Sequence, residues 1–156
     1  MKNMTIGIIS DTHGNLPAGL HEIFKGVDAI VHAGDIGDGA ILDELQRMAP
    51  VVAVRGNMDW GEWAGKLSGI EILRVENLKI GIIHDLYQMP AELISGSCRV
   101  VVNGHTHKAL IEEKKGVLYI NPGSAGQPRV KRPASVALLR ITEDRFKAEI
   151  IPLERS

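Results

Sequence analysis

The chain has 156 residues, of which 44% are hydrophobic and 24% are charged, which is typical of a globular protein. At about 150 residues per domain, a single domain over residues 1–156 is expected. The 18 basic and 19 acidic residues give a formal net charge of -1, so bulk electrostatics favour neither a nucleic-acid nor a membrane partner. No stretch approaches ~20 apolar residues, and the lone Cys98 excludes an internal disulfide, which favours a cytoplasmic location.

The first half of the chain alternates strand-like and helix-like segments. Residues 4–10 form a short, apolar, β-branched run that is typical of a buried strand. Residues 17–24 place three apolar side chains on one helical face, with Pro17 near the start, and predict a helix. The remaining elements of this half are a strand over 29–32, a helix over 40–48 and a strand over 51–54.

Paired strands dominate the second half. Glu76-Asn77, Lys115-Gly116 and Glu143-Asp144 are predicted turns between neighbouring strands. The predicted strands cover 70–75, 79–83, 100–102, 110–113, 117–120, 136–142 and 146–151, with a short helix over 91–94. Early helices and late strand pairs predict an α/β (α+β) fold in which two sheets pack together with helices outside.

Five of these strands end in polar residues of the same few types. Residues i and i+2 of an extended chain face the same side, so Asp11 and His13 can point into one site, as can His105 and His107. In α/β sheets, ligands gather beyond the carboxyl ends of the strands. The sequence therefore predicts one site from seven residues: Asp11, His13, Asp35, Asn57, His84, His105 and His107.

These side chains offer imidazole, carboxylate and carboxamide groups but no sulfur. Such ligands suit Mn, Fe, Zn, Co or Ni, and suit Mg less well. Because seven ligands exceed the needs of one ion, two ions that share a bridging carboxylate are expected. Two divalent ions carry more charge than Asp11 and Asp35 neutralise, so the site favours phosphate oxygens. The alternative is a set of polar strand ends that binds no metal.

The ordered set of motifs resembles the calcineurin-like metallophosphoesterases, in particular the small bacterial and archaeal phosphodiesterase branch that includes the retromer-subunit scaffold. The likeness runs from Asp11 to about Leu153, and the segment Asn121-Pro122-Gly123-Ser124 also matches that branch. It implies one metallophosphoesterase domain over residues 1–156, folded as a four-layer αββα sandwich of two mixed β-sheets flanked by helices.

The resemblance also implies a dinuclear centre. Asp11, His13 and His107 would hold one ion, Asn57, His84 and His105 would hold the other, and Asp35 would bridge them. The expected cofactors are two divalent ions, with Mn first and Ni, Co, Zn or Fe as alternatives. The implied activity is a phosphodiesterase in which a hydroxide shared by the two ions attacks phosphorus in line.

Two positions depart from the family pattern. Where many members have a histidine thought to protonate the leaving group, this chain has Met58, so the catalytic acid is unassigned and Asp59 loses its partner. The loss could cost roughly 10²–10⁴ in rate and favours substrates with good leaving groups. The small phosphodiesterase branch likewise lacks this histidine. Asp85 replaces a usual glycine and places an extra carboxylate near the second ion.

Several roles stay open at this point. Asn15 is a substrate-binding candidate for a phosphate oxygen or a turn-stabilising residue, and His32 is either a support for the site or a core histidine. A scaffold of the same fold, and a phosphomonoesterase or pyrophosphatase, remain alternatives to a phosphodiesterase. The expected partner is a small phosphodiester; family members are often oligomeric, which leaves a homo-oligomer open. Trp60 and Trp63 could line the pocket, form a subunit contact or pack locally.

Overall fold

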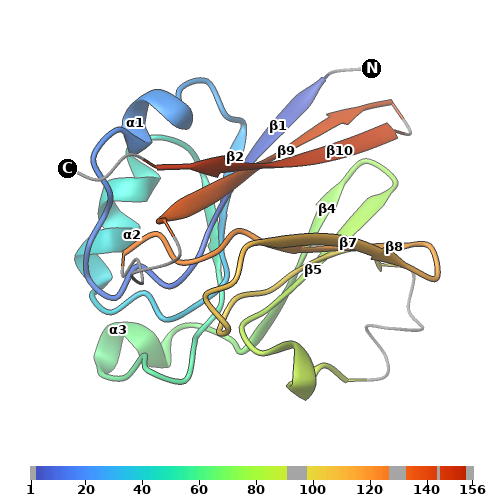
Figure 1. The fold of residues 1–156 in the computed structure, drawn as a ribbon. Coiled ribbons are helices and arrows are strands. Elements are labelled where there is room, and N and C mark those ends of the chain that lie inside the picture. The colour runs from blue at the N-terminus through green and yellow to red at the C-terminus, as the bar shows by residue number, and fades with distance from the viewer. Residues whose placement is uncertain (1–2, 91–97, 127–132, 144, 154–156) are drawn as a thin grey trace.

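A computed structural model describes residues 3–90, 98–126, 133–143 and 145–153, and it contains two five-stranded sheets (Figure 1). The first sheet has the order β10 (Arg145–Pro152), β9 (Ser135–Thr142), β1 (Met4–Ile9), β2 (Ala29–His32) and β3 (Val51–Ala53). The second has the order β4 (Ile70–Val75), β5 (Leu78–Ile83), β6 (Cys98–Val102), β8 (Val117–Asn121) and β7 (Leu110–Lys114).

Both sheets are mixed. In the first, β1, β2 and β3 run parallel, whereas β9 and β10 are antiparallel to their neighbours. In the second, β5, β6 and β8 run parallel, with β4 and β7 antiparallel at the edges. The predicted pair of packed sheets is therefore confirmed. The predicted ligands follow five of the six parallel strands, namely β1, β2, β3, β5 and β6.

The main core lies between the two sheets. Successive side chains of a strand face opposite sides, so Ile6 and Ile8 of β1 point inward to a cluster that includes Ile80 and Ile82 of β5. Each such buried side chain contributes about 1.5–3 kcal/mol to stability. Gly7 faces the other way, where a Cβ atom would lie 2.9 Å from a ring carbon of Phe24. The glycine therefore lets that ring pack directly on the sheet.

Helices cover the outer face of the first sheet. They are α1 (Leu20–Ile23) and α2 (Gly39–Gln46), with α3 (Glu62–Gly65) nearby (Figure 1). The helix predicted over 17–24 is shorter than expected, because Gly19 precedes α1 in a left-handed conformation (φ 85°). Asp38 caps α2 by accepting a hydrogen bond from the Ala40 N–H (3.0 Å). Leu20, Phe24 and Leu45 bury their side chains against the sheet.

The outer face of the second sheet carries a smaller apolar cluster and the single turn of 3-10 helix η1 (Leu86–Gln88). The helix predicted over 91–94, which would contribute to the fourth layer, lies outside the described residues. The predicted hairpin turn at Lys115-Gly116 is confirmed, with both residues at positive φ (51° and 81°), as a tight two-residue turn requires.

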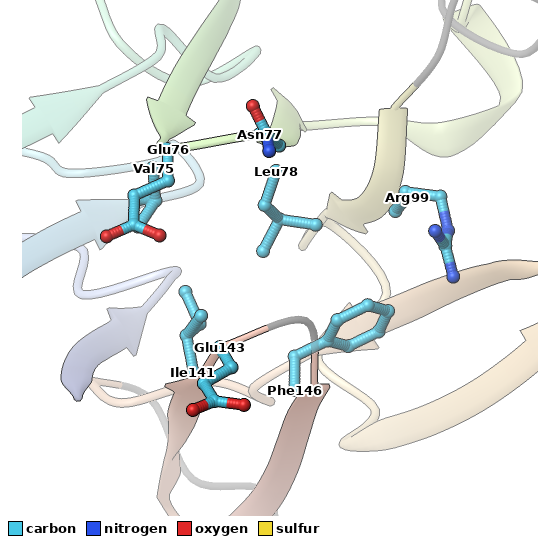
Figure 2. Close-up of a pocket in the computed structure, with 8 residues that line it drawn as sticks. All are labelled: Val75, Glu76, Asn77, Leu78, Arg99, Ile141, Glu143 and Phe146. Carbon is cyan, nitrogen blue, oxygen red and sulfur yellow. The ribbon is translucent and has the colours of Figure 1, made fainter. Parts of the chain in front are cut away.

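The far end of the sandwich, away from the predicted ligands, holds a small pocket of about 150 Å³ (Figure 2). It lies where the β4–β5 turn approaches β9, β10 and the start of β6, and the Arg99 guanidinium lies 5.7 Å from the centroid of the Phe146 ring. Val75 and Ile141 continue the inter-sheet core into it. Among the described residues, no helix has the length and apolarity to span a membrane.

Candidate metal centre

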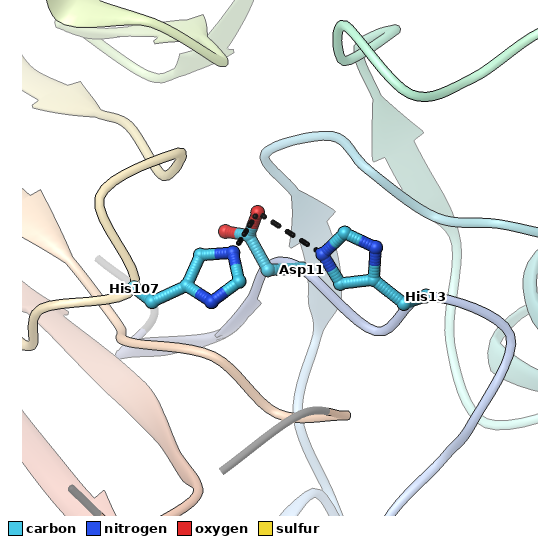
Figure 3. A group of neighbouring side chains, drawn as sticks. All are labelled: Asp11, His13 and His107. Atoms are coloured by element: carbon cyan, nitrogen blue, oxygen red, sulfur yellow. Dashed lines mark ion pairs between the residues drawn. The ribbon is translucent and has the colours of Figure 1, made fainter. Parts of the chain in front are cut away.

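The first group of predicted ligands converges on Asp11, which follows β1 (Figure 3). The fully buried Asp11 carboxylate places Oδ1 3.3 Å from His107 Nε2 and 3.8 Å from His13 Nε2. Figure 3 shows both imidazole rings pointing toward this oxygen from different loops. One atom from each of the three residues lies within 4.8 Å of the others, which is close enough for a shared ion.

A second group forms around Asp35, which follows β2. Asp35 Oδ2 lies 3.2 Å from His84 Nε2, and Asp35, His84 and His105 also offer ligand atoms within 4.8 Å of one another. Asn57 joins them, because its Oδ1 lies 2.9 Å from His84 Nε2 and 3.2 Å from His105 Nδ1.

The two groups adjoin. His13 Nε2 lies 4.0 Å from Asp35 Oδ2, and His84 Nε2 lies 4.0 Å from Asp11 Oδ1. Each carboxylate thus faces a histidine of the other group. The structure therefore brings all seven predicted residues together, from loops that belong to both sheets.

Five of these residues adopt a backbone conformation that side chains rarely tolerate. The φ angles are positive at Asp11 (54°), His13 (46°), Asp35 (55°), His105 (72°) and His107 (62°). A residue other than glycine costs about 1–2 kcal/mol in this left-handed region. Such strain clusters at functional sites, where the surrounding structure holds it in place.

Hydrogen bonds orient the Asp11 carboxylate so that one oxygen faces the histidines. The Ser10 hydroxyl and the His105 N–H donate to Oδ2 (2.7 and 3.2 Å), which leaves Oδ1 for the site. Gly104 permits this approach, because a Cβ atom there would collide with the Ser10 hydroxyl. Sequence reasoning missed Ser10, whose only signal is a polar residue at the end of an apolar strand.

His84 is oriented in the same way by the backbone. Its Nδ1–H donates to the Ala33 carbonyl (2.8 Å), so Nε2 points at Asp35 and Asn57. A hydrogen bond at one ring nitrogen determines which nitrogen is left for a metal.

Charge interactions move the pKa values of these groups. Burial alone would raise the pKa of Asp35, but the hydrogen bonds from His84 and from the Met58 N–H outweigh it and lower the value. Burial alone would lower the pKa of His84, but Asp35 and Asp11 raise it. Burial dominates at Asp11 and raises its pKa. Ionised Asp11 is therefore costly to hold without a positive charge beside it.

Two side chains brace the loops that carry the ligands. The Asp59 carboxylate accepts the Gly37 N–H (3.0 Å) and the Gly56 N–H (2.9 Å), so it joins the loops after β2 and β3. This supplies the role that the sequence left unassigned. Asn121 donates to the Gly104 carbonyl and the Thr106 hydroxyl (both 3.1 Å) and holds the loop of His105 and His107.

His32 is a buried support beside the site. Its Nδ1 accepts the Gly34 N–H (3.1 Å), so Nε2 carries the hydrogen and donates to the Thr12 hydroxyl (3.0 Å). That hydroxyl in turn donates to the Ile36 carbonyl (2.8 Å). Burial, reinforced by the charge of His84, lowers the pKa of His32 to about 3, so the ring stays neutral.

The donor set fits a metal ion. Asp11 Oδ1 and His13 Nε2 are buried and have no hydrogen-bond partner among the described residues. Buried polar atoms are rarely left unpaired, and these two point at the same place. Carboxylate oxygen and imidazole nitrogen are ligands that divalent transition metals accept together.

The departing positions line the rim of the centre. Met58 is 56% exposed. Asp85 has an ordinary extended backbone (φ -111°, ψ 113°), so an aspartate in place of the usual glycine causes no strain.

Trp60 is 81% exposed, whereas Trp63 packs against the first sheet's outer cluster, so local packing is confirmed for Trp63 alone. Asn15 lies exposed in a turn, where its N–H donates to the Thr12 carbonyl (2.9 Å).

A pocket of about 310 Å³ opens beside the second group. Arg55, Asp85 and Gln88 line it together with His84 and Asn57. Part of a bound substrate could occupy this space.

Comparisons with known proteins agree with this arrangement. Residues 4–144 match the model of the calcineurin-like phosphoesterase superfamily domain. A probable metallophosphoesterase from Methanocaldococcus jannaschii is 38% identical over 97% of this chain and 82% of its own length. A phosphodiesterase from the same organism is 35% identical over 77% of this chain and 83% of its own length.

Solved structures share the fold. A novel archaeal phosphodiesterase superposes with a TM-score of 0.74 at 28% identity, over 95% of this chain and all of that one. Vps29 from Entamoeba histolytica, in complex with zinc, gives a TM-score of 0.73 at 23% identity, over 96% of this chain and 99% of that one. The family match and the identity to the archaeal relatives show that the chain belongs to the calcineurin-like phosphoesterase superfamily.

Proposed function

We propose that the chain is a single metallophosphoesterase domain that hydrolyses small phosphodiesters with two divalent metal ions. The observation that carries the proposal is the convergence of two ligand groups around Asp11 and Asp35, with buried unpaired atoms of Asp11 and His13 facing one point. Relatives named metallophosphoesterase or phosphodiesterase support the activity.

The residues divide between the ions by proximity. Asp11, His13 and His107 would hold one ion, Asn57, His84 and His105 would hold the other, and Asp35 would contact both. Ions bound there would supply Lewis-acid activation of a water and of the phosphoryl oxygens. The protein itself would keep the ligand side chains and their loops in place. It does so through hydrogen bonds made by Ser10, Ala33, Asp59 and Asn121.

The substrate assignment follows from charge and from Met58. Two divalent ions and two carboxylates leave a positive site in a chain of net charge -1, which favours a phosphate group over other substrates. Because methionine cannot donate a proton, esters with good leaving groups are favoured. The pocket beside His84 would receive one arm of the ester, and Asn15 is the proposed contact to a phosphate oxygen.

Manganese is the proposed native metal, since a mixed set of imidazole, carboxylate and carboxamide ligands suits it, with Ni, Co, Zn or Fe as alternatives. A cytoplasmic location is proposed from the single cysteine, Cys98. In the sequence Arg129, Lys131 and Arg132 form a basic cluster that could steer a phosphate or belong to a solvated loop; these three positions lie outside the described residues.

The test is hydrolysis of bis-p-nitrophenyl phosphate and p-nitrophenyl phosphate by metal-stripped protein, with Mn, Ni, Co, Zn or Mg added back singly. We expect metal-dependent turnover that prefers the diester. Preference for the monoester would indicate a phosphomonoesterase instead. A folded protein that turns over neither substrate with any ion would indicate a non-catalytic scaffold.

A further inference from the structure

Two histidines of the second ligand group are held very differently. The His84 side chain is only 5% exposed, and its Nδ1–H is bonded to a backbone carbonyl. The His105 side chain is 41% exposed, and its ring meets the His84 ring edge-on (centroids 5.2 Å apart), so it is less enclosed than His84. A ring that binds a metal through one nitrogen needs a partner at the other nitrogen to hold its orientation.

The positions of the two His105 nitrogens identify that partner. Nδ1 lies 3.2 Å from Asn57 Oδ1 and therefore faces the second ligand group. Nε2, the other ring nitrogen, lies 4.0 Å from Asp85 Oδ2, which is within ion-pair distance but longer than a hydrogen bond. The carboxylate is thus on the side of His105 that faces away from the metal.

The Asp85 carboxylate is itself anchored. Its Oδ1 accepts the Tyr87 N–H (3.1 Å) and caps η1, which leaves Oδ2 directed toward His105. The extended backbone of Asp85 places the side chain there without strain.

We propose that Asp85 is a positioning residue for the second metal ion: when that ion binds, the carboxylate would close the observed 4.0 Å separation, accept the Nε2–H of His105 and so present Nδ1 to the ion. The inference rests on the proposed dinuclear centre. It assigns to Asp85 the role that the Ala33 carbonyl has for His84. Loss of such an outer partner typically weakens metal binding by about 10–100-fold.

The first test is calorimetric titration of metal-stripped protein with zinc. We expect two binding steps in the wild type. Asp85→Asn keeps an oxygen that can cap η1 but removes the carboxylate charge, and should weaken one step by about 10–100-fold while leaving the other within about twofold. Asp85→Gly, which removes the side chain, should weaken the same step. The matched control is Asp38→Asn, which alters the carboxylate that caps α2 without facing a ligand, and should leave both steps unchanged.

The second test reads the ring directly. Imidazole ¹⁵N spectra of the zinc-loaded wild type should show His105 metallated at Nδ1 and protonated at Nε2, with the Nε2 proton exchanging faster in Asp85→Asn. Equal zinc affinities in the wild type and Asp85→Asn, or zinc on Nε2, would overturn the inference and leave the dinuclear centre standing. A wild type that binds no zinc, manganese or nickel would overturn the proposed function and this inference with it.

Discussion

Asp35 is the residue on which both halves of the centre depend. Its Oδ2 lies 3.2 Å from His84 Nε2 and 4.0 Å from His13 Nε2, and its Oδ1 accepts the Met58 N–H. An asparagine could keep the hydrogen bond from Met58, but it would lack the negative charge.

Asp35→Asn should lower kcat by at least about 100-fold and weaken both metal-binding steps, because a ligand matters at least as much as an outer partner. Activity with manganese and zinc calorimetry measure the two effects. Asp43→Asn, on the exposed face of α2, is the control. Full activity in Asp35→Asn would show that this carboxylate does not bridge two ions.

Substitution of Met58 tests whether the site lacks a proton donor for the leaving group. The Met58 N–H donates to Asp35 Oδ1 (2.8 Å) and the residue is 56% exposed, so a histidine there would lie next to the centre and open to solvent. Met58→His should raise kcat by about 10-fold or more on diesters with poor leaving groups, and far less on p-nitrophenyl esters. A series of aryl esters of graded leaving-group acidity measures this. An equal change across the series would count against the argument.

His32 makes stability depend on pH. Its pKa is about 3 in the folded protein, against an ordinary value of 6.5, so between these two pH values the unfolded chain binds a proton at His32 and the folded protein does not. Stability is unaffected above pH 6.5 and is lost as the pH falls below it. Between pH 7.5 and 5 the loss is about 2 kcal/mol.

His32→Asn, whose amide oxygen can accept the Gly34 N–H, should remove that loss. Urea unfolding of metal-free wild type and variant at the two pH values measures it. Parallel pH dependence in both proteins would mean that His32 titrates normally.

At the scale of elements, the strands follow from side-chain patterning and the short helices do not. Runs such as 4–10 are apolar on both faces because helices and a second sheet cover them, and that pattern is readable in one sequence. The turns α3 and η1 span only four and three residues, too few for a helical period to emerge. Gly19 has a left-handed backbone and delays the start of α1, and the spacing of apolar residues gives no sign of this.

The candidate site likewise has one part that the sequence predicts, the ligands, and one part that it does not, the hydrogen bonds that support them. Its ligand types and their places after strands were visible in the sequence, and the structure brings all seven residues together. The braces were not visible, because Asp59 reaches Gly37 across 22 positions and Ser124 reaches the Asp11 carbonyl across 113. Such pairs form only once the sheets have packed.

Asp59→Ala tests this bracing between loops. It leaves the N–H groups of Gly37 and Gly56 without their acceptor, which should cost about 1–3 kcal/mol of stability and also weaken metal binding. Denaturant unfolding and zinc calorimetry measure the two. Asp28→Ala, which removes the exposed carboxylate that accepts the Thr5 N–H, should cost less and leave metal binding intact. Unchanged zinc affinity in Asp59→Ala would confine its role to stability.

For the whole molecule, the centre links two sheets whose other main contact is the apolar core. The proposed ligands come from loops after β1, β2 and β3 in one sheet and after β5 and β6 in the other. An ion that binds only the folded arrangement stabilises it by about 2.7 kcal/mol when its concentration is 100 times its Kd.

Removal of metal should therefore lower the free energy of unfolding by about that amount per occupied site. Thermal unfolding with and without a chelator measures the difference, which Asp35→Asn should reduce. A wild type that unfolds at the same temperature in both conditions would show that the ions do not hold the sheets together.

The left-handed backbone at five ligand positions has a consequence for how such a chain changes over generations. Glycine adopts that conformation without penalty, so mutation to glycine relieves strain at each of these positions even as it deletes a ligand. In a lineage that no longer uses the metal, relief of this strain would favour that drift, and it would be opposed where the side chain accepts hydrogen bonds, as at Asp11 and Asp35. The ligand set persists only while activity is selected, and its erosion can leave the sandwich itself intact.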